Sequence, residues 1–290
     1  MASLKEVKGR IATVNNTRKI TSAMKMVASA KLHKAQGAIT NMLPYERRLH
    51  GLLTNLLGGG EVLVWNTPRE VKRVALVVFS SNSSLCGGFN ANVIKHATQW
   101  LNEYQALGKD NILLYPVGKK VADALSKMGY AVQGNFQHLA DKPSFAEAAE
   151  LAQGLMNLFT QGEIDRVELL YNHFKSTASQ ILTREVYLPF LLSSPEQSEE
   201  ARKHQEETDY ILEPSREELL ETLLPKVLRM KLYTVLLDSN ASEHAARTMA
   251  MQIATDNADD LLQELTLMYN KTRQQAITNE LLDIVGGSMA

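Results

Sequence analysis

The chain has 290 residues, an apolar fraction of 44% and a formal net charge of −1, which allows one large domain or two modest ones. It contains no run of eighteen or more uncharged apolar residues, and its first ten residues lack the apolar stretch of a secretory signal. We therefore expect a cytosolic-type protein whose association with any membrane is indirect. A single cysteine, Cys86, excludes an internal disulfide and a multi-cysteine metal site.

The N-terminal segment, residues 1–57, predicts one long basic helix. Residues 1–50 carry ten Lys or Arg against two acidic residues. A spacing of three and four residues separates successive apolar side chains at Leu4, Val7, Ile11 and Val14, and again at Ile20, Met24 and Val27. A 3.5-residue period is typical of a left-handed coiled coil. We expect Pro44 to bend this helix and the glycines at 58–60 to end it.

The middle segment, residues 72–192, predicts an α/β domain. Residues 73–80 form an apolar run of strand length, and helical stretches at 90–107, 119–128 and 145–159 alternate with a second strand at 111–117. This alternation indicates a parallel sheet covered by helices. Residues 167–174 and 180–190 predict a closing hairpin. One α/β domain is thus inserted between two helical segments.

The last segment, residues 215–290, predicts a second long helix that follows an acidic linker at 193–214. Ser215 and Glu218 form a capping box at its start. Apolar steps of three or four residues are expected to form its seam, at Leu220, Leu224 and Val227, then Leu261, Leu265 and Met268, and finally Ile277, Leu281 and Ile284. Only Pro225 interrupts it. Seventy helical residues would span roughly 105 Å, so the helix needs a partner, most simply the N-terminal helix in an antiparallel coiled coil.

Three classes of function stay open on these patterns alone. The loop at 80–90 follows the first strand, where nucleotides bind in α/β sheets, but the chain has no GxGxxG motif, no complete phosphate loop and no GxSxG motif around Ser83 or Ser84. Its seven histidines show no metal-binding spacing. The basic helix could bind nucleic acid, or it could be steered into an acidic protein cavity. The alternatives to a mechanical protein are therefore a nucleic-acid-binding coiled coil and an α/β nucleotide-binding enzyme with helical arms.

Specific motifs at both ends resolve this choice through a resemblance. Residues 18–31 and 269–287, with 245–251, 254–257 and 85–90 between them, are similar to signatures of the gamma subunit of F-type ATP synthases. The resemblance spans the whole chain. Two departures stand out: the run Asn82-Ser83-Ser84 replaces the usual Asp-Arg-Gly, and Gly287 is followed by Ser288 in place of alanine.

The resemblance implies a non-catalytic rotor shaft of a proton- or sodium-translocating synthase, with no cofactor, no metal and no catalytic residue of its own. The implied partners are three alpha and three beta subunits in a ring, the epsilon subunit and the membrane rotor c-ring, at the cytoplasmic face of a bacterial inner membrane. The residues implied to contact beta subunits are Arg273, Gln274, Thr278, Glu280 and Asp283, with Met24 and Lys25 lower on the shaft. The residues implied to form a bearing tip are Ile284, Val285 and Met289.

Overall fold

The computed structural model describes residues 3–57, 65, 67–190, 212–213 and 215–288. Two helices are far longer than the others: α1 (Leu4–Leu57) and α7 (Arg216–Ser288). The chain divides into two compact units, Met1–Ala30 with Arg247–Ala290 (unit 1) and Lys31–Ala246 (unit 2), and each is described by itself. No helix within the described ranges is long and apolar enough to cross a membrane.

Both long helices continue through a proline. Pro44 lies inside α1 and Pro225 inside α7, so the expected interruption at Pro225 was wrong. A proline in a helix interior costs about 3 kcal/mol because it removes one backbone hydrogen bond and crowds the preceding turn. The flanking residues Leu224 and Leu228 are fully buried, and their packing offsets this cost.

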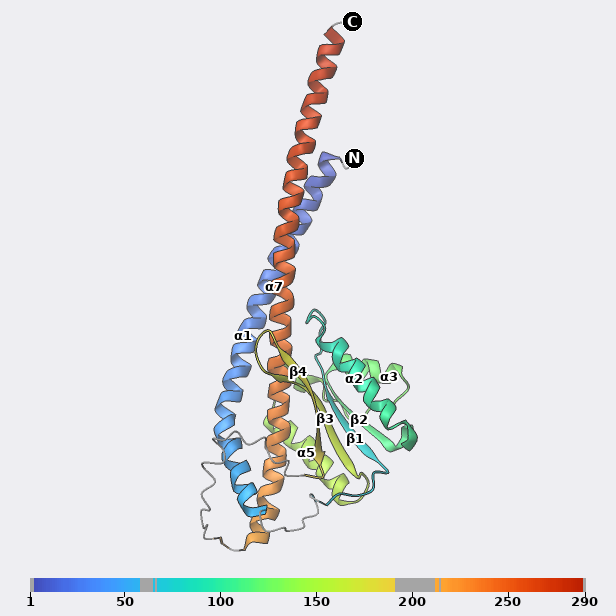
Figure 1. Ribbon diagram of the computed structural model, residues 1–290, viewed down its shortest axis with the longest axis vertical. Helices are drawn as coiled ribbons and strands as arrows, with labels where there is room; N and C mark the ends of the chain where they lie inside the picture. Colours follow the sequence, from blue (N-terminus) through green and yellow to red (C-terminus); the bar gives the residue numbers. More distant parts are fainter. Residues whose placement is uncertain (1–2, 58–64, 66, 191–211, 214, 289–290) are drawn as a thin grey trace. The chain divides into compact units, whose positions relative to one another are not determined.

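Unit 2 contains a four-stranded mixed sheet in the order β2-β1-β3-β4 (Figure 1). The strands β1, β2 and β3 are parallel, and β4 is antiparallel to β3, which agrees with the expected closing hairpin. Their bounds are Val74–Phe79, Ile112–Val117, Arg166–Phe174 and Gln180–Leu188 for β1 to β4. All six side chains of β1 are buried, because helices cover both faces of the sheet.

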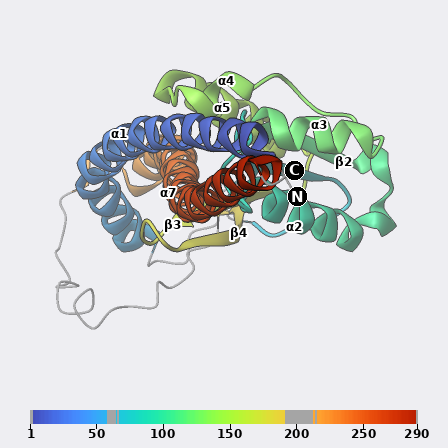
Figure 2. The same cartoon turned by 90° about the horizontal axis from the view of Figure 1, so that it is seen from above.

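The helices of unit 2 form the two outer layers (Figures 1 and 2). Their bounds are Phe89–Glu103 for α2, Lys119–Lys127 for α3, Gln137–Asp141 for α4 and Phe145–Thr160 for α5. One face packs on α2 and α3 and the other on α5, the end of α1 and the first part of α7. The expected helix 90–107 is shorter, because 3₁₀ turns follow it at Gln105–Leu107 and Lys109–Asn111. The five-residue helix α4 was not predicted from the sequence.

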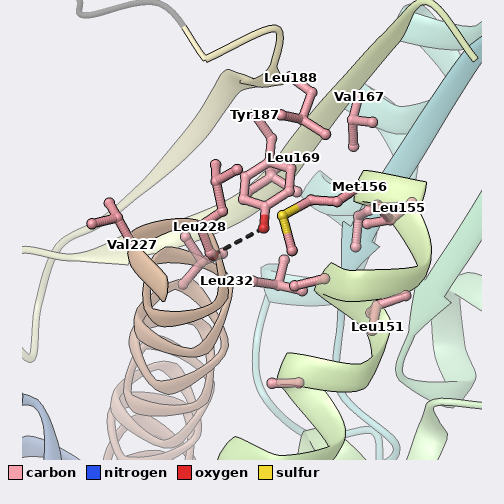
Figure 3. Close-up of a cluster of buried hydrophobic side chains, with 14 of the residues drawn as sticks. Leu151, Leu155, Met156, Val167, Leu169, Tyr187, Leu188, Val227, Leu228 and Leu232 are labelled. Atoms are coloured by element: carbon pink, nitrogen blue, oxygen red, sulfur yellow. Dashed lines mark hydrogen bonds between the residues drawn. The ribbon is translucent and has the colours of Figure 1, made fainter. Parts of the chain in front are cut away.

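The larger core joins the two long helices to the sheet. It contains Leu49 and Leu53 from α1, Leu228 and Leu232 from α7, and side chains of α5 and all four strands. Figure 3 shows the Tyr187 ring among side chains of α5, α7 and the strands. The Tyr187 hydroxyl donates a hydrogen bond of 2.9 Å to the carbonyl oxygen of Leu228. Burial raises the pKa of Tyr187 above its usual value. In unit 2 the helices are therefore anchored to the domain by apolar packing with a polar contact inside it.

The other face of the sheet encloses a buried carboxylate. Glu168 on β3 is 1% exposed and accepts hydrogen bonds from Trp100 Nε1 at 2.6 Å, Tyr104 Oη at 2.8 Å and Arg184 Nε at 2.9 Å. Burial, followed by the hydrogen bond to Glu168, raises the pKa of Tyr104. Because an unpaired buried charge is costly, this network ties β4 and α2 to β3 through one acid.

Candidate functional site

The two helices of unit 1 pair in antiparallel directions (Figures 1 and 2). Three contacts define the pairing: Arg18 Nη1 donates to Asp259 Oδ1 at 2.9 Å, the Thr21 and Thr255 hydroxyl oxygens lie 2.9 Å apart, and Lys25 Nζ donates to Gln252 Oε1 at 2.6 Å. Partner numbers on α7 fall as those on α1 rise. The expected antiparallel pairing of the terminal segments is thus present in this unit.

The seam between these helices follows one strict heptad phase. On α1 it continues from Leu4, Val7, Ile11 and Val14 into Arg18, Thr21, Lys25 and Ala28, each of which is buried or half-buried. On α7 it runs through Met251, Thr255, Ala258, Leu262, Leu265, Tyr269 and Thr272. The expected seam residues Ile20 and Val27 are instead 60% and 58% exposed, and Leu261 and Met268 are exposed as well. Those four assignments were wrong, because they followed apolar residues out of phase.

The middle of this seam is polar. Thr21 is 9% exposed, whereas the Arg18 and Asp259 side chains are 40% and 47% exposed. An ion pair this exposed contributes at most about 1 kcal/mol, so it adds little to the stability of the paired helices. Polar groups at core positions of a coiled coil do specify register, since any slip separates donors from acceptors. This band was detectable in the sequence by extending the 4, 7, 11, 14 phase without regard to polarity.

Several large apolar side chains of unit 1 are exposed outside the seam. Its α1 members Ile20, Met26 and Val27 are between 58% and 62% exposed. Those on α7 are Met249, Ile253, Leu261, Leu267 and Met268, between 36% and 72% exposed. Large apolar side chains left exposed on paired helices are typical of surfaces that other protein covers.

The C-terminal part of α7 extends beyond the start of α1. The three contacts place Leu4 at about the level of residue 273 of α7, given equal rise along both helices. Every side chain from 273 to 285 is exposed, including Ile277, Leu281 and Ile284, which were expected in the seam. We call residues 273–288 the unpaired end, because α1 does not extend beside this stretch of α7, which is about 24 Å of helix. It has charged and apolar residues but buries neither kind within unit 1.

The residues singled out from the sequence divide between these surfaces. Those on the unpaired end are Arg273, Gln274, Thr278, Glu280, Asp283, Ile284 and Val285, and all are exposed. Met24 is half-buried, and Lys25 lies in the seam with its ammonium group on Gln252. Met289 lies outside the described residues, as does nearly all of the acidic segment 193–214.

In unit 2, α7 occupies the position where α/β sheets bind ligands. Such ligands sit outside the carboxyl ends of parallel strands. There Leu236, Ser239, Asn240 and Glu243 of α7 face Phe79, Ser80 and Val117 at the ends of β1 and β2, around a residual cavity of about 10 Å³. Asn240 Nδ2 donates to the Ala140 carbonyl oxygen at 2.7 Å. A space of this size holds about one water molecule, so a helix of the chain itself fills the crevice.

The loop at 80–90 is held by its own side chains. Asn82 Oδ1 accepts a hydrogen bond from the Lys119 backbone N–H at 2.8 Å at the start of α3, and its Nδ2 donates to Asp141 Oδ2 at 2.7 Å. Gly118, just before α3, has φ of +114°, and a Cβ there would lie 2.2 Å from the Ser80 carbonyl oxygen. These contacts give the departure at Asn82 a local role, in which the residue caps α3 and ties it to α4.

Comparisons with known proteins agree on one family. The sequence profile described as ATP synthase matches residues 3–290. An ATP synthase gamma chain of Phocaeicola vulgatus is 68% identical over 100% of both chains, and one of Flavobacterium johnsoniae is 47% identical over 100% of this chain and 99% of its own. Among solved structures, a chain of the Tetrahymena thermophila mitochondrial ATP synthase central stalk and c-ring is 26% identical, with a TM-score of 0.57 over 81% of this chain and 99% of its own. A chain of the Euglena gracilis enzyme, 20% identical, shares the fold with a TM-score of 0.63 over 99% and 93%.

Proposed function

Because the chain belongs to the gamma-chain family and is thus the central stalk of an F-type ATP synthase, we propose that its paired helices form the shaft that drives the catalytic sites. The observation that carries this proposal is the unpaired end of α7. A helix whose side chains are all exposed from 273 to 285 gains stability only when another surface covers it. A surrounding ring of alpha and beta subunits, three of each, supplies such a surface.

The mechanism follows from symmetry. One asymmetric helix cannot make the same contacts with three beta subunits at once, so each rotational position favours a different conformation at each catalytic site. Coupling free energies are reciprocal, so nucleotide binding and release at those sites bias the orientation of the shaft in turn. Catalysis belongs to the ring in this proposal, and the chain itself is non-catalytic. The crevice at the carboxyl ends of β1 and β2 is consistent with that assignment, because α7 fills the position where α/β sheets bind nucleotides.

The proposed contacts with beta subunits use the polar side chains of the unpaired end. These are Arg273, Gln274, Thr278, Glu280 and Asp283, and all five are exposed. Met24 is assigned to a beta subunit lower on the shaft. Lys25 shares that assignment while its ammonium group also holds Gln252, so its contact is made by the stem of the side chain. Ile284 and Val285, with Met289, form an apolar tip that turns in the ring with few hydrogen bonds to break.

The α/β domain is assigned to the part of the complex next to the membrane. A Rossmann-like α/β domain, residues 72–192, inserted between the helical segments 1–57 and 215–290, contacts the epsilon subunit and the c-ring. The acidic linker is residues 193–214. The assembly lies at the cytoplasmic face of a bacterial inner membrane, and the chain joins it as a peripheral subunit. The translocated cation is a proton or sodium.

The first test is the composition of the native complex. Gentle solubilisation of membranes, capture of this chain and native mass measurement are expected to give one copy with three copies each of two ATP-binding subunits. A free chain, a homo-oligomer or a nucleic-acid complex would overturn the proposal.

A second test separates the unpaired end from the rest of the surface. Arg273→Ala is expected to lower ATP-driven ion pumping by assembled complexes, because it removes a cation from the contact with the ring. Lys95→Ala, which removes an exposed cation from α2 in the α/β domain, is the matched control and is expected to have no effect. Equal pumping by the two variants would contradict the assignment of Arg273.

A further inference from the structure

Strand β3 is longer than its parallel neighbour. Its register with β1 runs from Val74 opposite Arg166 to Val78 opposite Leu170, whereas its pairing with β4 continues to Phe174 opposite Gln180. The last four residues of β3 therefore have a strand on one side only. Alternate residues of a strand direct their backbone N–H and C=O groups to the same side, so Asn172 and Phe174 share a side.

Helix α7 takes up these backbone groups with two side chains. Ser242 Oγ donates to the Asn172 carbonyl oxygen at 2.8 Å, and Asp238 Oδ1 accepts from the Phe174 N–H at 2.7 Å. The second carboxylate oxygen of Asp238 lies 2.6 Å from His173 Nδ1. Asp238 and Ser242 are four residues apart and so lie on one face of the helix. Two side chains of α7 thus replace the hydrogen bonds that a strand would have made.

The Ser242–Asn172 contact is buried, the Asp238–Phe174 contact is part-buried, and both are supported by packing. Ser242 is fully buried and Asn172 is 5% exposed. The Phe174 ring packs on Leu32 and Ala35 of α1 and on Ala241 and Ala245 of α7. A buried backbone group without a partner is costly, so the end of β3 and this part of α7 hold each other in one position.

We propose that Asp238 and Ser242 form a clamp on the end of β3 that carries twisting load between the sheet and α7. This rests on the proposed function as a shaft. Unit 2 ends at Ala246, one turn beyond Ser242, so the clamp holds α7 close to the point where the helix passes into unit 1. Apolar packing is non-directional, whereas hydrogen bonds weaken steeply with angle and therefore add directional resistance to sliding or turning of the helix. Asp238 and Ser242 are accordingly positioning residues for rotary coupling.

The test uses complexes that contain the full-length chain, reconstituted in vesicles. The variant Asp238→Ala/Ser242→Ala removes the clamp. Thr234→Val is the matched control, since the Thr234 hydroxyl donates only to the Met230 carbonyl oxygen of the same helix. Hydrogen exchange is measured for peptides that span residues 172–174. An oxonol dye reports membrane potential whichever cation is carried. Its signal divided by the rate of ATP hydrolysis gives ion pumping per ATP.

Loss of the clamp is expected to speed exchange at Phe174 by about tenfold and to lower pumping per ATP by about twofold, with both quantities normal in the control. Ser242→Ala alone is expected to shift both in the same direction by less, and it decides the matter if the double variant does not assemble. Unchanged exchange would overturn the clamp itself. Faster exchange with a normal pumping ratio, even if fewer complexes assemble, would overturn its role in coupling. Failure of the shaft proposal is seen separately, as pumping by complexes that lack this chain.

Discussion

The unpaired end of α7 gives a prediction about hydrogen exchange in the free chain and in the assembled complex. Residues 273–285 have no buried side chain, so opening this end from its terminus exposes little apolar surface and mainly breaks helix hydrogen bonds. A propagation constant close to 1 per residue makes such fraying cost little free energy, and we expect protection of about tenfold. The seam differs, because opening it exposes Met251, Ala258 and Leu265, which are 5% to 6% exposed. Two large side chains at about 1.5–3 kcal/mol each correspond to protection of about a hundredfold or more.

The assay is hydrogen exchange with mass spectrometry on the free chain and on the complete complex. In the free chain, peptides from 273–285 are expected to exchange at least ten times faster than those from 251–265. In the complex, the same end is expected to become protected as the ring covers it. Two results would refute the reasoning: strong protection of 273–285 in the free chain, or no added protection of this end in the complex.

Three further predictions concern stability. Glu168→Gln keeps the size of the side chain but removes its buried charge, and it should lower the unfolding free energy of unit 2 by about 3–5 kcal/mol in urea titrations; a loss below 1 kcal/mol would contradict the network. Burial raises the pKa of Tyr187, so its stabilising effect is present below pH 10, the usual tyrosine pKa, and is lost as the pH rises further. Tyr187→Phe should cost about 1 kcal/mol at pH 8 through loss of the Leu228 contact and should lessen the alkaline fall in Tm, and an unchanged fall would count against it. In a charge-exchange cycle, Arg18→Asp should be rescued by Asp259→Arg with a coupling of about 1 kcal/mol or less that weakens in salt, whereas a salt-independent coupling of several kcal/mol would mean a far drier seam.

Sequence patterns predicted the elements with strong periodicity. The residues of the apolar run at 73–80 and of the steps from Leu4 to Val14 are buried or half-buried in the structure, because burial and periodicity are directly linked. The hairpin of β3 and β4 was also predicted. The short helix α4 was missed, since five residues carry too little periodicity to stand out from a loop.

The errors in the seam have a physical cause. Apolar residues were taken to mark the contact between helices, but Ile20 and Val27 face outward, while Arg18, Thr21 and Lys25 face the partner helix. A protein that is covered by others exposes apolar side chains as a monomer, so hydrophobicity alone does not distinguish internal from external contacts. Spacing is the better guide here.

Contacts that depend on tertiary structure could not be predicted from the sequence. Nothing in the neighbourhood of Asp238 or Ser242 indicates that they bond the backbone of a strand some 70 residues earlier. The filling of the crevice by α7 depends in the same way on where a distant helix packs. The assignments on the unpaired end came from a family resemblance, and those contacts stay predictions until the complex is measured.

The filled crevice makes α7 a permanent intramolecular ligand of the α/β sheet. A diffusible ligand occupies such a position only in proportion to its concentration, but a tethered one experiences an effective concentration set by the chain that connects it. Occupancy is then independent of metabolite levels. The carboxyl ends of the strands, which bind small molecules in other α/β proteins, are instead held permanently against α7. With a diffusible ligand, this geometry would let the sheet respond to ligand concentration. With a helix of the same chain in that position, it connects the sheet firmly to α7.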